Sequence, residues 1–163
     1  MSGWFARVGL PLAGDEHAAI GELVDAVAPE GSRDVLLLKS WHDALRFVRA
    51  SEFDSAWWDQ EEQEREWLWT RAAEGRSESA LLQDIVALSA GLVPQVRAAA
   101  TAAGAGDPAI VDEAMGSALL AAQQNALAEL AGEPHGHRFR RKFALFAGGR
   151  WPLGYHAARF VIF

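Results

Sequence analysis

The 163-residue chain contains no cysteine. Disulfide bonds, thiolate metal sites and cysteine nucleophiles are therefore excluded. No uncharged run is suited to crossing a bilayer, because the longest, from Ala114 to Ala128, is short and carries Gln and Asn side chains. Residues 1–7 lack the apolar core of a signal peptide. These absences favour a soluble, cytoplasmic protein that is not bound to a membrane.

Motifs of the common catalytic classes are also missing. The chain has no Gly-x-Ser-x-Gly nucleophile elbow and no Gly-x-x-x-x-Gly-Lys phosphate loop. Its nearest glycine-rich stretch, residues 102–106, has two glycines with no lysine after them and is typical of a turn between helices. We therefore expect no cofactor, and nothing identifies a catalytic residue.

The composition is that of a globular protein. Half of the residues are hydrophobic, 23% are charged and seven are tryptophan, which argues against disorder. A chain of this length can bury one sizeable core. No linker or internal repeat divides it, so we expect a single domain over residues 1–163.

Charge is distributed unevenly along the chain. Residues 1–132 contain nine Lys and Arg against 21 Asp and Glu, a balance of −12, whereas residues 133–163 have a balance of +5. An acidic body repels nucleic acid and attracts basic proteins through its long-range field. The whole chain, with a net charge of −7, makes nucleic acid an unlikely partner.

Hydrophobic periodicity predicts a strand near each end of the chain and helices between. A two-residue period covers residues 3–11 and 138–162, with a tight hairpin turn at Gly148-Gly149. The short apolar run Val35–Lys39 is consistent with a buried strand. We predict an α+β domain whose small, mostly antiparallel sheet combines N-terminal strands with a C-terminal β-hairpin.

About five central helices are expected to cover that sheet. They are predicted over residues 15–28, after the capping boxes Ser40–Asp43 and Ser51–Asp54, over residues 79–103 and from Asp107-Pro108 to about residue 131. Pro94 is expected to kink or split the helix over residues 79–103.

The most informative stretch is residues 59–66, eight polar residues between Trp57-Trp58 and Trp67-Leu68-Trp69. Five are carboxylates and one is an arginine. A helix of this composition has no apolar face, so it stands in solvent or meets positive charge. We expect it to be a partner-binding surface made of six residues: Trp58, Asp59, Glu61, Glu62, Glu64 and Glu66. The competing interpretation is pairing with Arg138, Arg140, Arg141 and Lys142, within the chain or across a dimer.

Two other features carry weaker hypotheses. His135 and His137, two residues apart, could chelate a metal with Glu133 or with His17, His42 or His156, although no third ligand stands at an expected spacing. We therefore expect no metal. Residues 138–143 mix cations with phenylalanines, as single-stranded nucleic-acid sites do, but those rings have the phase of core residues.

Together these patterns favour a non-enzymatic protein-binding module. An acidic inhibitor, such as an immunity protein or antitoxin that engages a basic, nuclease-like toxin, would gain fast, steered association from its carboxylates. The alternatives are a small metal-dependent hydrolase that uses the loop with His135 and His137, and a structural subunit of a homo-oligomer such as a homodimer.

Overall fold

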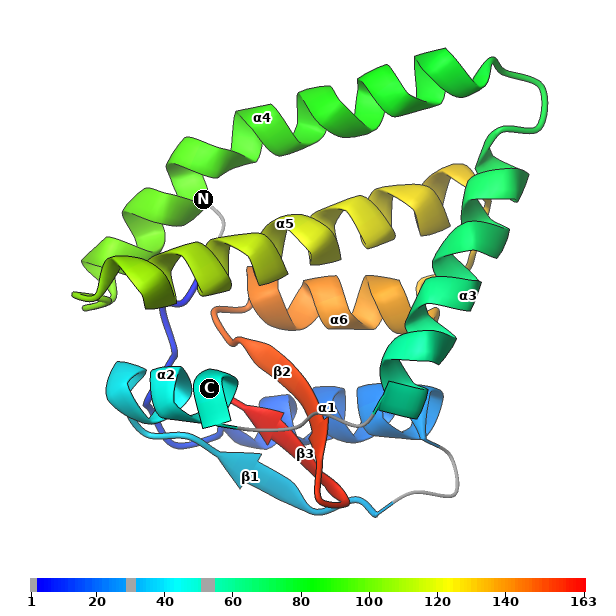
Figure 1. Cartoon of the computed structure of the whole chain (residues 1–163). Coiled ribbons are helices and arrows are strands. Elements are labelled where there is room, and N and C mark those ends of the chain that lie inside the picture. Colours follow the sequence, from blue (N-terminus) through cyan, green and yellow to red (C-terminus); the bar gives the residue numbers. More distant parts are fainter. Residues whose placement is uncertain (1–2, 29–31, 51–54) are drawn as a thin grey trace.

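The computed structural model describes residues 3–28, 32–50 and 55–163. Within them, one strand follows the first helix, five further helices come next, and two strands end the chain's described elements (Figure 1). The elements are α1 (Gly14–Val27), β1 (Val35–Leu37), α2 (Trp41–Ala50), α3 (Ser55–Ala72), α4 (Glu78–Ala102), α5 (Pro108–Leu130), α6 (Arg138–Ala147), β2 (Pro152–His156) and β3 (Arg159–Ile162). The predicted α+β class is confirmed.

The sheet is mixed, with the strand order β1-β3-β2. β1 pairs with β3 in parallel, placing Val35 opposite Phe160, whereas β2 and β3 form an antiparallel hairpin. The central strand is buried on both faces: Phe160 and Ile162 pack with α1, and Val161 joins the opposite core. The prediction that an N-terminal strand meets the C-terminal hairpin is thus correct for β1.

Residues 3–11 do not form the predicted strand. Their backbone makes successive turns, with Ala6 N bonded to Gly3 O and Val8 N to Phe5 O. Trp4 and Phe5 are both buried although they are neighbours, which an extended chain with one buried face would not allow. Positive φ angles at Phe5 (56°) and Gly9 (74°) interrupt any extended conformation.

The predicted strand over residues 138–147 is instead helix α6. Its buried side chains are Arg138, Phe139, Lys142, Leu145 and Phe146, and this spacing of three to four residues is helical. Gly149, which was expected in a hairpin turn, lies instead just after the end of this helix and has a φ of 99°. The hairpin turn lies at Ala157-Ala158, where both φ angles are positive (48° and 59°).

The remaining helices follow their sequence signals. The side-chain oxygen of Ser40 accepts a hydrogen bond from the Asp43 amide at the start of α2, and that of Asp107 accepts from Ala109 at the start of α5. α4 runs through Pro94 as one helix, so the predicted split does not occur. The second predicted capping box, Ser51–Asp54, lies outside the described residues.

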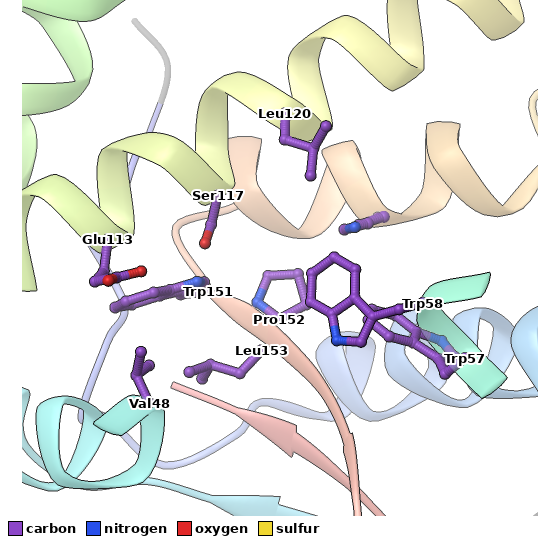
Figure 2. Close-up of a pocket in the computed structure, with 10 residues that line it drawn as sticks. Val48, Trp57, Trp58, Glu113, Ser117, Leu120, Trp151, Pro152 and Leu153 are labelled. Carbon is purple, nitrogen blue, oxygen red and sulfur yellow. The ribbon is translucent and has the colours of Figure 1, made fainter. Parts of the chain in front are cut away.

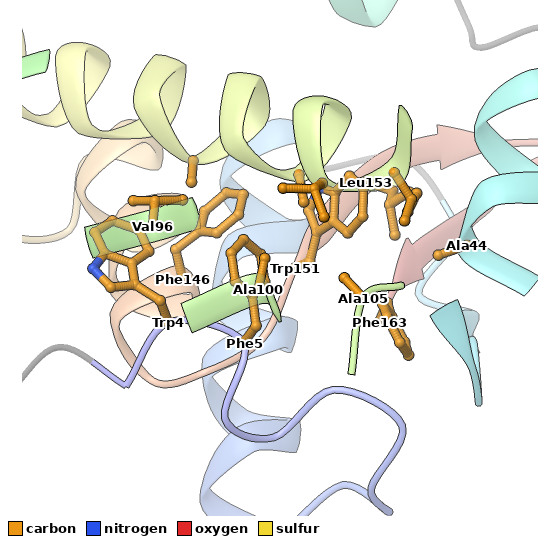
Figure 3. Close-up of a cluster of buried hydrophobic side chains, with 14 of the residues drawn as sticks. Trp4, Phe5, Ala44, Val96, Ala100, Ala105, Phe146, Trp151, Leu153 and Phe163 are labelled. Atoms are coloured by element: carbon orange, nitrogen blue, oxygen red, sulfur yellow. The ribbon is translucent and has the colours of Figure 1, made fainter. Parts of the chain in front are cut away.

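Three clusters of buried side chains hold these elements together. The largest joins the N-terminal turns to α4, α5, α6 and the sheet, with Trp4, Phe5, Phe146 and Trp151 among its members (Figure 3). A second packs α1 on the other face of the sheet. The third joins α3, α4, α5 and the start of α6 around Leu68, Leu81, Ile85, Leu127 and Phe139. Through the third cluster, α3 and α4 are fixed at one end of α5.

Candidate functional site: helix α3 and the hollows beside it

Helix α3 presents two different faces, although its sequence looks uniformly polar. Trp57, Glu61 and Leu68 are buried, and Glu64 is half-buried. Asp59, Glu62 and Glu66 are exposed. At 100° per residue these sets occupy opposite sides of the helix. The acidic segment therefore divides into an inner face, which packs on α5 and α6, and an outer face toward solvent.

The inner face centres on a buried ion pair between Glu61 and Lys142. The Lys142 ammonium donates to both Glu61 oxygens, at 3.0 and 2.9 Å, and to Gln124 Oε1 at 3.2 Å. The exposed fractions are 2% for Glu61, 2% for Gln124 and 6% for Lys142. Burial lowers the pKa of Lys142, and the Glu61 carboxylate opposes that shift. All three ammonium protons have acceptors, so this lysine has no donor left for a ligand.

Glu64 extends the same network toward the start of α6. Its carboxylate oxygens lie 2.8 Å from Nε2 of His137 and 3.2 Å from Nη1 of Arg138. Nδ1 of His137 accepts from the Phe139 amide and so caps α6. Both imidazole nitrogens of His137 are thus engaged within the fold, whereas His135 is exposed. Nothing in this geometry assembles the metal site considered for these two histidines.

No group of three or more Asp, Glu and His side chains stands ready to hold a metal ion in residues 3–28, 32–50 and 55–163. His137, Glu64 and Arg138 instead form a charged cluster at the N-terminus of α6. It can fix the crossing of α3 over α6, and it offers no open coordination position.

Most of the basic side chains between residues 138 and 159 make contacts within the chain. Arg138, Lys142 and Arg150 are buried, and Arg141 pairs with Glu22. Arg140 donates to the backbone oxygen of Glu133 at 2.9 Å. The interpretation that basic residues pair with the acidic segment is therefore realised for two of the four predicted cations, Arg138 and Lys142, which meet Glu61 and Glu64.

The outer face of α3 retains four of the six predicted partner-binding residues: Trp58, Asp59, Glu62 and Glu66. Asp59 and Glu66 form no ion pair with the described residues, whereas Glu62 pairs with Arg65 one turn away, which lowers the pKa of Glu62. Glu61 is enclosed and Glu64 faces α6, so neither contributes to this surface as predicted. The physical reason is that the buried ammonium of Lys142 needs a carboxylate partner.

The two exposed tryptophans do not flank this face symmetrically. Trp58 and Trp67, with exposed fractions of 41% and 50%, are nine residues apart and project from opposite sides of α3. The Arg71 guanidinium lies 4.7 Å from the centre of the Trp67 ring and pairs with Glu133. Trp58 packs edge-on against Trp57 and remains open to solvent. Trp58 is therefore the tryptophan available beside the acidic face.

A partly enclosed pocket of about 130 Å³ lies beside Trp58. Figure 2 shows Glu113 and Ser117 reaching toward it from α5, with Trp57 and Trp58 on one side and Trp151 on the other. Its walls are mainly apolar, and its volume resembles that of cavities that hold one small aromatic molecule.

A second hollow, a shallow groove, separates α3 from α4. It is lined by Arg65, Glu66, Trp69, Thr70, Leu82, Ile85, Val86 and Gln123. Gln123 donates to the Ser89 hydroxyl at 2.7 Å and so ties α5 to α4 beside the groove. On α3, Trp58, Arg65 and Trp69 share one side at helical spacing, so the pocket and the groove open on the same side of this helix.

Sequence reasoning named Lys142 as a possible partner of the acidic segment but did not identify Glu61 as its carboxylate, and it missed Gln124. Lys142 and Glu61 are 81 residues apart, so no local pattern indicates which carboxylate turns inward. Comparisons of the chain with protein-family models, with curated proteins and with solved structures found no match.

Proposed function

We propose that the chain is a non-enzymatic binding protein whose outer α3 face engages a basic protein partner. The observation that carries this proposal is the exposed stripe of Asp59, Glu62 and Glu66 beside Trp58, which has an excess of negative charge because its nearest cation, Arg65, is paired with Glu62. Carboxylates presented in this way steer a basic partner during diffusion, and an accessible indole supplies apolar contact area once it has arrived.

A toxin inhibitor is the biological role that this surface suits best. A nuclease active site attracts phosphate and is therefore positively charged, so an acidic helix can occupy it and block substrate. The net charge of −7 adds a long-range attraction to the local one. Absence of cysteine fits the reducing cytoplasm in which such an inhibitor would protect the cell that makes it.

Affinity capture from the source cells, followed by mass spectrometry, tests this proposal with three forms of the protein. The wild type is compared with Asp59→Asn/Glu62→Gln/Glu66→Gln, which removes the outer stripe. The control, Asp15→Asn/Asp34→Asn/Glu129→Gln, removes three exposed carboxylates elsewhere and changes the net charge equally. We expect the wild type and the control to retain one basic protein and the outer-stripe variant to lose it.

Binding kinetics of the captured protein then separate steering from simple adhesion. The association rate should fall as salt is raised from about 50 to about 300 mM, because screening shortens the range of the charges. Capture of the same protein by the outer-stripe variant, at an unchanged rate, would contradict the proposal. Release of nuclease activity on dissociation would identify the inhibitor role.

A further inference from the structure

Helix α4 carries a strip of apolar surface that the fold leaves uncovered. Leu82 and Val86 are 52% and 57% exposed, and they stand one turn apart on the side of α4 that faces the groove. By length and composition, α4 is the one helix in the described ranges apolar enough to cross a membrane, yet only 17% of its apolar 18-residue stretch is buried. Exposed aliphatic side chains next to Trp69 and Ile85 mark this groove as an interaction site.

Charge around the groove is acidic. Arg65 is neutralised by Glu62, which accepts from both Nε and Nη2 of its guanidinium. Glu66, on the groove wall, interacts with the charge of Arg65 without forming an ion pair, so Glu62, Arg65 and Glu66 together carry one excess negative charge. Asp59 lies on the same outer side of α3 two turns earlier and adds a second. An occupant therefore meets apolar side chains along α4 and an excess of negative charge along α3.

We propose that this groove binds an amphipathic helix with a basic flank, contributed by another protein. Leu82, Val86 and Trp69 would receive its apolar face, and Glu66 would receive a lysine or arginine from the flank. The α4 wall has apolar side chains at one-turn spacing, and this spacing matches the ridges of another helix. The proposal rests on the proposed function, which it deepens by naming the structural class of the basic partner.

Two other occupants fit the charges less well. A second copy of this chain brings the same acidic helix and a net charge of −7, so the two copies repel each other. Anionic membrane surfaces repel the chain for the same reason. Leu81, Ile85 and Val96 of α4 are moreover buried against the protein, which holds the helix on α5.

The test uses a synthetic 18-residue peptide made of leucine and lysine, with leucine at helical spacing, a fluorescent label and blocked ends. Two matched peptides serve as controls: one with glutamate in place of lysine, and one with the same composition in a non-amphipathic order. Binding to the full chain is followed by fluorescence anisotropy. We expect the basic amphipathic peptide to bind most tightly, and its affinity to fall several-fold on raising salt.

Variants of the protein locate the binding site. Leu82→Gln/Val86→Gln should weaken peptide binding at least about tenfold, because two buried aliphatic contacts are lost. Ala87→Gln/Ala98→Gln alters exposed positions on the opposite side of α4 and should leave binding unchanged. Thermal unfolding of each variant verifies that it folds.

Several results would overturn the inference. One is equal affinity of the basic peptide for the wild type and the Leu82/Val86 variant, and another is equal affinity of the wild type for the basic and the acidic peptides. A third is a wild-type dimer that dissociates in the Leu82/Val86 variant. The fourth is flotation of the wild type with phosphatidylcholine vesicles that is lost in this variant. The captured natural partner separates the two proposals. Loss of capture in the Asp59/Glu62/Glu66 variant alone would uphold the proposed function and refute the groove. Loss in the Leu82/Val86 variant alone would refute the proposed function and, with it, the basic flank that the groove proposal assigns to Glu66.

Discussion

At the scale of single residues, Glu61 and Glu62 are neighbours with different tasks. Glu61 is enclosed with Lys142, whereas Glu62 lies in solvent beside Arg65. Glu61→Gln should destabilise the fold by roughly 3 kcal/mol and lower the melting temperature by about 6–12 °C, since it leaves a buried ammonium uncompensated. Glu62→Gln is the matched control and should melt with the wild type, because exposed pairs contribute little. Equal melting of both variants in calorimetry would mean that Glu61 is not enclosed.

Arg150 is a buried cation with four hydrogen bonds from its guanidinium. It is 1% exposed and donates to the backbone oxygens of Leu10 and Pro11 and to both oxygens of Glu16. Hydrogen bonds from Arg150 lower the pKa of Glu16 to about 2 from an ordinary value of 4.5. The Arg150 guanidinium thus connects the N-terminal turns to the segment that follows α6.

This bonding predicts a dependence of stability on pH. Because the folded pKa of Glu16 is depressed, its contribution is complete above about pH 4.5 and is lost as pH falls toward about 2. Urea unfolding at pH 6, 4 and 3 should therefore show a steeper loss of stability for the wild type than for Glu16→Gln, which is destabilised at every pH. Parallel pH profiles for the two proteins would contradict this assignment.

At the scale of elements, the β2–β3 hairpin uses a turn for which its residues are poorly suited. Ala157 and Ala158 both have positive φ, a conformation that costs a residue with a Cβ roughly 1 kcal/mol or more. Ala157→Asn/Ala158→Gly supplies the pair preferred in such turns and should raise the stability by about 1–2 kcal/mol. Chemical denaturation measures this change. Destabilisation by the substitution would show that the turn has another conformation in solution.

Gly154 marks a close approach between β2 and α3. A Cβ built there would lie 2.9 Å from the Trp57 ring, and the φ of Gly154 is 119°. Gly154→Ala should therefore cost about 2 kcal/mol or more through both strain and overpacking. Gly116→Ala, in the middle of α5 with nothing within 4 Å, should instead gain about 0.5–1 kcal/mol. Opposite signs in thermal unfolding are the expected result.

The sequence predicted elements well where a cap or a long helical period was present. α1, α2, α4 and α5 begin within one or two residues of their signals, and the α+β class follows from them. Residues 138–147 fit both a two-residue and a helical period, and only burial of Arg138 and Lys142 against α3 selects the helix. Cations in core positions carry no periodic signal.

The candidate site was predictable only in part, for a related reason. The composition of residues 59–66 identified the acidic helix but not which of its carboxylates turn inward, since that depends on a lysine in α6. The groove beside Leu82 and Val86 was not predicted at all. Apolar residues at helical spacing are expected to be buried, and no pattern within α4 distinguishes a covered side from an open one.

At the scale of the whole molecule, the sheet depends on segments from distant parts of the chain. β1 contributes residues 35–37 and its partner β3 contributes residues 159–162, while five helices lie between them. A chain truncated after His156 keeps every described helix and loses the central strand. We expect it to retain helical circular dichroism without a cooperative thermal transition, because Phe160 and Ile162 close the core over α1. A sharp transition near the wild-type temperature would refute this dependence.

Because the central strand β3 comes late in the sequence, it is synthesised after the segments that it packs against. A ribosome releases α1 and β1 long before it releases β3, so Ile20, Leu23 and Val24 must wait for Phe160 and Ile162 before their apolar surface is covered. The helices between can pair locally in the meantime, since α4 and α5 are neighbours along the chain and in space. The nascent protein therefore passes through a stage in which its helical half is assembled while the first helix and an unpaired strand edge stay exposed, and this is the stage at which a chaperone would bind it.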